Sequence, residues 1–155
     1  MAVPRRYAEV GNQSTVSSSF KTGLTVIAST STRGAIYFFN LGTTGTAADG
    51  VLEWRASRFT AAGTTTSVTP VALDPADPAA LLSAGSNATG EPTYTGATSL
   101  FDQGLNQRAT YTWIAVPGGE LLIPATSSNG IGFAMLSTVS PAYTGVGNIS
   151  CHHFE

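Results

Sequence analysis

Apolar and polar residues alternate along several stretches of this chain, with the period of two that is typical of a β-strand with one buried face. In residues 51–59, Leu52, Trp54 and Ala56 point to one side, and the residues between them are charged or polar. This stretch therefore predicts a half-buried strand.

The end of the chain, residues 146–154, alternates in the same way. Ile149, Cys151 and His153 fall on one face, and the residues between them fall on the other. Further strands are expected at Thr22–Ser29, Ala35–Leu41, Thr64–Leu73 and Ile131–Leu136, with a weaker one at Glu91–Leu100. The second of these is so apolar that we expect it in the centre of a sheet.

Residues 107–116 and 120–124 predict a β-hairpin. The first strand alternates, with Tyr111 and Trp113 on one face. Pro-Gly-Gly at 117–119 supplies the turn between the two strands.

One short helix is expected near residues 75–84. Prolines suit its first turn, Asp74 or Asp77 is placed to cap it, and Gly85 is placed to end it.

These elements predict an all-β protein. About eight short strands in a chain of this length fit an antiparallel two-sheet sandwich, for which we expect the jelly-roll connectivity. An immunoglobulin-type sandwich is the alternative, although the chain lacks its Cys…Trp…Cys pattern. We assign residues 21–155 to this single domain and residues 1–20 to an N-terminal arm that orders against a neighbouring subunit.

Charge is scarce, at 10% of residues against about 25% in an average soluble protein. The net charge of −2 predicts no nucleic-acid partner. Residues 121–154 contain no Asp, Glu, Lys or Arg, and proline and glycine interrupt them, so we expect no membrane span. This uncharged run predicts strands at a subunit interface, where lysine at Ser150 or Thr138 should impair assembly more than folding.

Few residues are candidates for metal binding. His152 and His153 are the only histidines, and as neighbours on a strand they point to opposite faces, so they do not chelate one metal within a chain. A metal shared between subunits is the alternative. Cys151 is the only cysteine, so the chain forms no internal disulfide, and we expect a buried, inert thiol.

The carboxylates form no recognisable catalytic or calcium-binding motif. Helix capping explains Asp74 and Asp77, and Glu53 and Glu91 lack a third partner. The chain has no nucleophile elbow and no phosphate-binding glycine motif. We therefore expect no enzyme activity, no catalytic residues, no cofactor and no metal ligands.

Four aromatic residues admit two interpretations. Trp54, Trp113, Tyr111 and Tyr143 are expected in the core, because aromatic residues on alternating strands usually pack there. The alternative is a sugar-stacking platform.

Three arginines, Arg55, Arg58 and Arg108, lie in strand segments that hold few other charges. We expect them to form ion pairs between strands or between subunits. Their expected partners are Glu53, Glu91, Asp102 and Glu120.

Three segments, Arg58–Leu81, Glu91–Thr95 and Leu105–Phe133, together resemble one group of known proteins. Asn-Gln-Arg-Ala-Thr, then Trp, then Pro-Gly-Gly-Glu-Leu is similar to a pattern in small proteins encoded by tailed-phage genomes and viral metagenomes. The similarity extends from about Arg58 to the C-terminus, roughly two-thirds of the chain. What the resemblance implies is a virion structural component of the capsid-decoration kind; it implies no catalytic or ligand-binding residues.

The expected function is that of an oligomeric bacteriophage capsid decoration (cement) protein, with a homotrimer as the expected assembly. It would be made in the cytoplasm of the host bacterium, become part of the virion, and stabilise the capsid surface by binding the major capsid protein or other virion proteins. The alternative is a carbohydrate- or receptor-binding module of a head or tail fibre.

Overall fold

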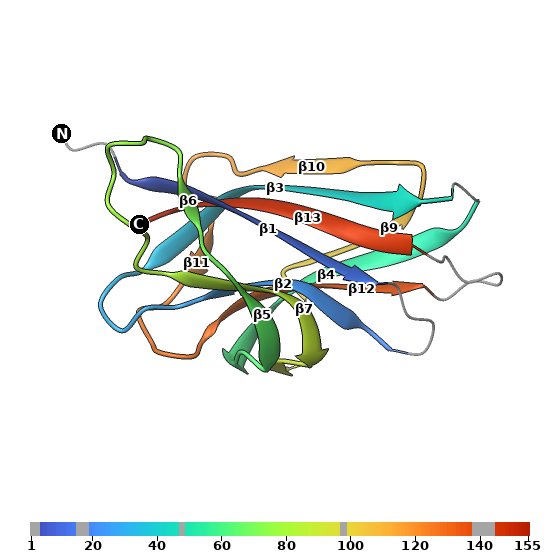
Figure 1. The fold of residues 1–155 in the computed structure, drawn as a ribbon, viewed down its shortest axis with the longest axis horizontal. Coiled ribbons are helices and arrows are strands. Elements are labelled where there is room, and N and C mark those ends of the chain that lie inside the picture. Colours follow the sequence, from blue (N-terminus) through green and yellow to red (C-terminus); the bar gives the residue numbers. More distant parts are fainter. Residues whose placement is uncertain (1–3, 15–18, 47–48, 97–98, 138–144) are drawn as a thin grey trace.

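The chain folds into two antiparallel β-sheets that pack face to face as two layers (Figure 1). The computed structural model describes residues 4–14, 19–46, 49–96, 99–137 and 145–155. Every regular element in these ranges is a strand, and none of the described residues belongs to a helix that could cross a membrane.

The first sheet, sheet A, has six strands in the spatial order β10-β3-β13-β1-β6, with β11 also paired to β3. Its strands are β1 (Arg6–Ser14), β3 (Gly34–Gly45), β6 (Val71–Ala72), β10 (Tyr111–Ile114), β11 (Leu121–Ile123) and β13 (Gly145–Phe154).

The second sheet, sheet B, has seven strands in the order β5-β7-β2-β12-β4-β8, with β9 also paired to β4. Its strands are β2 (Lys21–Ile27), β4 (Val51–Ala61), β5 (Thr64–Val68), β7 (Ser83–Gly90), β8 (Thr93–Tyr94), β9 (Phe101–Asn106) and β12 (Gly130–Ser137). The all-β antiparallel sandwich expected from the sequence is thereby confirmed, while the jelly-roll connectivity stays a prediction.

No helix forms near residues 75–84, so that prediction is wrong. The Asp74 carboxylate accepts a hydrogen bond from the backbone N–H of Ala76 and makes a tight turn instead of a cap. The chain then extends into β7, which pairs with β2; Leu82, just before β7, and Ala84 within it are both buried in the core. A helix of two turns has little stability of its own, so burial in the sheet decides the conformation.

The hairpin expected from residues 107–116 and 120–124 is also absent. β10 and β11 do not pair with each other; both pair with β3, one after the other and in the same direction. The residues between them leave the sheet in a turn, closed by a hydrogen bond from the Gly119 N–H to the Val116 carbonyl, and then rejoin it. With 12 residues, β3 is long enough to pair with both short strands along one edge.

Strand β1 lies inside sheet A, although residues 1–20 were expected to form an arm. It pairs with β13 along its whole length. The Gln13 amide also donates a hydrogen bond to the Ala88 carbonyl of β7, at 2.9 Å, which ties β1 to sheet B. The sandwich therefore includes Arg6–Ser14; residues 1–3 and 15–18 lie outside the described ranges.

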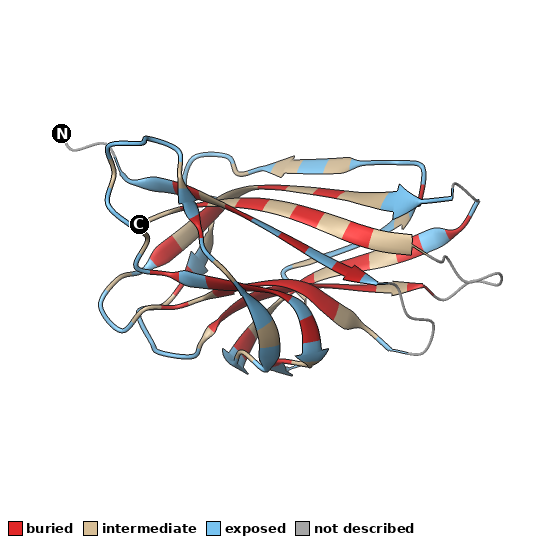
Figure 2. Ribbon diagram, in the orientation of Figure 1, coloured by how far each residue is buried: buried red, intermediate tan, exposed pale blue. Residues whose placement is uncertain are grey.

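The uncharged run of residues 121–154 supplies a central strand to each sheet. β12 lies between β2 and β4, and β13 lies between β3 and β1. β12 is buried almost throughout, whereas β13 alternates between buried and partly exposed positions (Figure 2). At the buried positions of β12 and β13 an ionised side chain would lose its hydration, which is a reason for charge to be absent there.

Candidate functional site

Four aromatic side chains gather on the outer face of sheet A. Tyr37 stacks on Phe154 with ring centroids 4.2 Å apart, and Phe38 packs against His152 at 4.6 Å. A β-bulge makes this possible, because β13 pairs with Phe38 and next with Ile36, which leaves Tyr37 without a partner. Tyr37 and Phe38 consequently both contact His152.

Aliphatic side chains surround this cluster. Their register in β1, β6, β10 and β11 places them on the same side of the sheet. The exposed fractions are high: Val10 62%, Val71 65%, Ile114 68% and Leu122 44%. Exposed apolar residues that gather in this way are typical of interaction sites. The apolar face, as we name it, comprises Tyr37, Phe38, His152, Phe154, Val10, Val71, Ile114 and Leu122.

The apolar face carries almost no charge. The strands of sheet A hold two charged residues, Arg6 and Glu9, and Glu9 is buried between the sheets. Ser150 pairs with Val10 and therefore borders the apolar face, whereas Thr138 lies outside the described residues. The strands of sheet B, by contrast, carry Lys21, Glu53, Arg55, Arg58 and Asp102.

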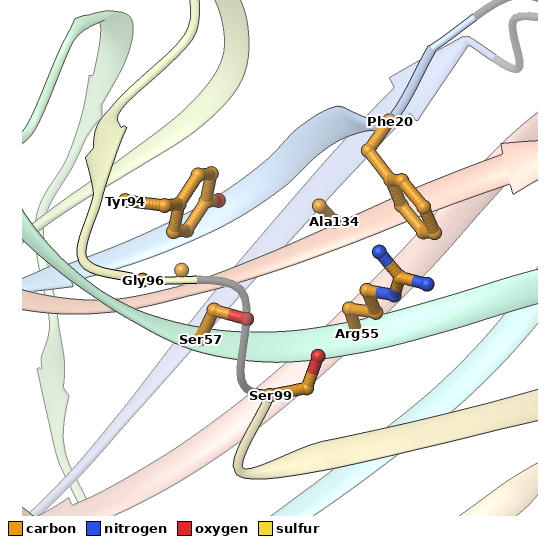
Figure 3. A pocket seen from close by; sticks show the side chains of 8 residues that line it. Phe20, Arg55, Ser57, Tyr94, Gly96, Ser99 and Ala134 are labelled. Atoms are coloured by element: carbon orange, nitrogen blue, oxygen red, sulfur yellow. The ribbon is translucent and has the colours of Figure 1, made fainter.

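A pocket of about 160 Å³ opens on the outer face of sheet B (Figure 3). It is lined by Phe20, Arg55, Ser57, Tyr94, Gly96, Ser99, Gly132 and Ala134. A Cβ atom at Gly132 would come within 2.5 Å of the Tyr94 hydroxyl, so glycine allows the Tyr94 ring to lie against the sheet. The small residues of β4 and β12 form the floor, and the two rings form opposite walls.

Arg55 lies at the rim of this pocket. Its Nη2 donates to Glu53 Oε1 at 2.6 Å, its Nε donates to Asp102 Oδ2 at 2.8 Å, and its guanidinium lies 4.1 Å from the centre of the Phe20 ring. Burial lowers the pKa of Arg55, but the hydrogen bond to Asp102 and the two carboxylate charges outweigh burial and raise it. The two carboxylates therefore already compensate the guanidinium charge.

Tyr94 is held in place by a chain of hydrogen bonds. Its hydroxyl lies 2.6 Å from Thr22 Oγ1, which in turn donates to Glu91 Oε2 at 2.6 Å. Because the Thr22 hydroxyl has one proton, Tyr94 is the donor in the first bond. Burial raises the pKa of Tyr94, so the ring remains a neutral wall of the pocket.

A third group of polar residues is buried beneath sheet A. His153 is fully buried, with Nδ1 at 3.0 Å from Glu9 Oε2 and Nε2 at 3.4 Å from Glu155 Oε1. Burial lowers the pKa of His153, but the hydrogen bond and charge of Glu9, followed by those of Glu155, outweigh burial and raise it. Glu155 also accepts the backbone N–H of Leu82, so this cluster fastens the end of β13 to the segment before β7.

The structure also places the residues considered for metal binding and thiol chemistry from the sequence, which are His152, His153 and Cys151. The two histidines do point to opposite faces: His153 is fully buried and His152 is partly exposed. Within the described ranges, no three His, Cys, Asp or Glu residues are placed to hold a metal. Cys151 is buried, as expected, and burial raises the pKa of its thiol.

The tryptophans do not form a sugar-stacking platform. Trp54 is 1% exposed, which confirms the prediction that it belongs to the core. Trp113 stacks on the buried Phe39 at 5.0 Å, and Tyr111 also packs against the core. Tyr143, the fourth candidate, lies outside the described residues.

The three arginines form bonds within the chain. Arg55 pairs with two of its predicted partners, whereas Arg108 pairs with Asp49 at 3.0 Å, which was not predicted. Arg58 donates a hydrogen bond to the backbone carbonyl of Leu122 and so links sheet B to sheet A.

Both surfaces contain residues that pattern analysis does not select. The bulge at Tyr37 breaks the period of two, and the only sequence signal for it is that Tyr37, Phe38 and Phe39 are consecutive aromatic residues. Phe20 and Tyr94 are far apart in the sequence, and their neighbours show no shared motif.

Comparison of the chain with models of known protein families finds no match, and no curated protein and no solved structure matches it either. The antiparallel two-sheet sandwich is therefore the class to which the fold assigns the protein.

Proposed function

We propose that this protein is a structural component of a bacteriophage virion: a capsid decoration protein that forms a homo-oligomer, most simply a trimer, and binds the major capsid protein. The resemblance of roughly two-thirds of the chain to phage-encoded proteins supports the virion assignment. The apolar face is the observation that carries the assembly.

We assign the apolar face to contact with another copy of the same chain. Two such faces do not repel each other, because Arg6 is the one charged strand residue on the outer side of sheet A. Aromatic side chains are enriched and charged side chains depleted in the cores of protein interfaces, and this face has both properties. Assembly would also cover the exposed Val10 and Ile114 side chains.

The assembly is tested with one matched pair of variants. Val10→Lys places a charge on the apolar face, whereas Val51→Lys makes the same change on sheet B, where Val51 is 40% exposed. Light scattering at micromolar concentration should show an oligomer for the wild type and for Val51→Lys, and a monomer for Val10→Lys. Circular dichroism should show the same folded state for all three proteins. Ser150→Lys should behave like Val10→Lys.

A wild-type protein that is monomeric at micromolar concentration, or a Val10→Lys variant that assembles normally, would contradict the proposed homo-oligomer.

Attachment to the virion is tested by electron cryo-microscopy of the particle. Density for the sandwich on the capsid surface is expected, and density on the tail alone would contradict the decoration role. The fibre-module alternative stays a second candidate; of its stacking residues Trp54 is buried, Trp113 stacks on Phe39, and Tyr143 lies outside the described residues.

A further inference from the structure

We propose that the pocket on sheet B binds one pyranose ring of a neutral carbohydrate. This inference does not rest on the proposed assembly, because the pocket and the apolar face lie on different sheets. It also uses none of the tryptophans considered from the sequence.

The shape of the pocket suits a single saturated ring. A pyranose presents C–H groups on its faces and hydroxyls around its edge, so it packs against aromatic rings while its edge needs polar partners. Phe20 and Tyr94 stand on either side of the Ala134 floor (Figure 3). The volume of about 160 Å³ is below the ~300 Å³ or more of pockets for larger ligands, which limits the occupant to one ring.

The pocket also offers free hydrogen-bonding groups. Ser57 and Ser99 line it, and their hydroxyls make no hydrogen bond with any described part of the chain. Arg55 uses Nε and Nη2 for its two carboxylates, while its Nη1 has no partner among the described residues. A hydroxyl both donates and accepts, so the two serines can serve sugar hydroxyls in either role, and Nη1 can donate to a sugar oxygen.

The charges around the pocket favour a neutral ligand. Arg55 is paired with two carboxylates, Glu53 and Asp102, so the group carries a net negative charge that disfavours phosphates and other anions. A cationic ligand would be repelled by the Arg55 guanidinium, which lies at the rim of the pocket and already makes a cation–π contact with the Phe20 ring.

The rigidity of one wall supports binding as well. Tyr94 is fixed by its hydrogen bond to Thr22 and by its contact with Gly132, so it loses little freedom when a ligand stacks on it. Phe20 lies outside the strands and contacts the Arg55 guanidinium through a cation–π interaction, so it is the more adjustable wall.

The experiment is a saturation-transfer NMR titration of the full chain with methyl glycosides of glucose, galactose and mannose and with N-acetylglucosamine. At least one should bind with a dissociation constant on the order of 1 mM, as expected for a ligand of about a dozen heavy atoms. Phe20→Ala removes one wall and should weaken that binding about tenfold. Ala134→Leu fills the floor and should abolish it.

Ser57→Ala should weaken binding about threefold or more, through the loss of one hydrogen bond. Ser83→Ala is the matched control, because Ser83 is exposed on β7 and does not line the pocket. Thermal unfolding of each variant separates loss of binding from loss of the fold.

Three results would overturn the proposal. They are the absence of saturation transfer to all four sugars at 20 mM, transfer that persists unchanged in Phe20→Ala and Ala134→Leu, and, when adenosine and choline are titrated as comparison ligands, their binding in place of the sugars. The assembly measurement with Val10→Lys is unaffected by any of these outcomes, so the two proposals fail separately.

Discussion

The outer faces of the two sheets differ in where they place charge. Sheet A exposes aromatic and aliphatic side chains, and of its two charged strand residues it buries Glu9 beside His153. Sheet B exposes charged pairs, such as Arg55 with Asp102, around a small pocket. The difference shows that a single sandwich can provide two surfaces of different chemistry: one apolar and almost without charge, and one with charged pairs around a small pocket.

The outer faces of the two sheets also differ in the size of their side chains. On sheet A the bulge adds an aromatic residue to the outer face, which fills it. On sheet B small residues such as Gly132 and Ala134 leave room above the strands, and Tyr94 lies over part of it. Consequently the outer face of sheet A is filled by side chains, while the outer face of sheet B has a cavity.

The largest effect is expected where sheet A buries its charge. Glu9→Gln removes the carboxylate beside the fully buried His153, so we expect the free energy of unfolding to fall by about 3–5 kcal/mol. Urea denaturation at pH 6 measures it. A loss below about 1 kcal/mol would mean that the two sheets do not differ in how their charged residues contribute to stability.

The two histidines should give opposite pH dependence. The pKa of His153 is raised in the folded state, so its stabilisation is fully present below about pH 6.5, the unfolded value, and is lost as the pH rises through the folded pKa. Burial lowers the pKa of His152, so its neutral form is favoured and stability falls as the pH drops below about 6.5. His153→Gln should remove the loss at high pH, and His152→Gln should remove the loss at low pH. Unfolding curves between pH 5 and 9 that are identical for both variants would contradict this assignment.

The room available above each sheet can be compared by placing a methyl group at one glycine of sheet B and at one glycine of sheet A. Gly132→Ala should cost about 1–3 kcal/mol, because its Cβ would meet the Tyr94 hydroxyl at 2.5 Å. Gly42→Ala on sheet A should be neutral or slightly stabilising, since the nearest atom lies 3.5 Å away, on Thr110. Thermal melts of both variants check this. Equal destabilisation would show that both faces are equally crowded.

The smallest effect is expected at the exposed charges of sheet B. Asp102→Asn breaks the ion pair between Asp102 and Arg55. The Arg55 side chain is 38% exposed and that of Asp102 is 44% exposed, so the free energy of unfolding should fall by at most about 1 kcal/mol. The difference from wild type should shrink further in 1 M salt. A loss that is larger and independent of salt would mean that this pair contributes to stability as we expect the buried Glu9–His153 pair to do.

The sequence by itself determined which residues form most strands and which sides of them are buried. Alternation in residues 51–59 and 146–154 was sufficient to place Trp54 and Cys151 in the core, because a strand presents successive side chains to opposite faces. The scarcity of charge in residues 121–154 also carried information, since both of its long strands are central in their sheets.

Only the tertiary structure decided which strands pair. The turn residues at 117–119 indicate that the chain bends, but they do not specify which strand pairs with the segments on either side. In the structure, both β10 and β11 pair with the long strand β3. The expected helix near residues 75–84 was likewise replaced, because local preference for two helical turns is weaker than burial of Leu82 and Ala84.

The apolar face and the pocket on sheet B also depend on the tertiary structure. The bulge at Tyr37 arises from the register between β3 and β13, and the pocket exists because Phe20 and Tyr94, distant along the chain, lie on either side of Ala134. Local patterns describe one strand at a time, whereas a surface is formed by the register between strands, and that register is set by long-range packing.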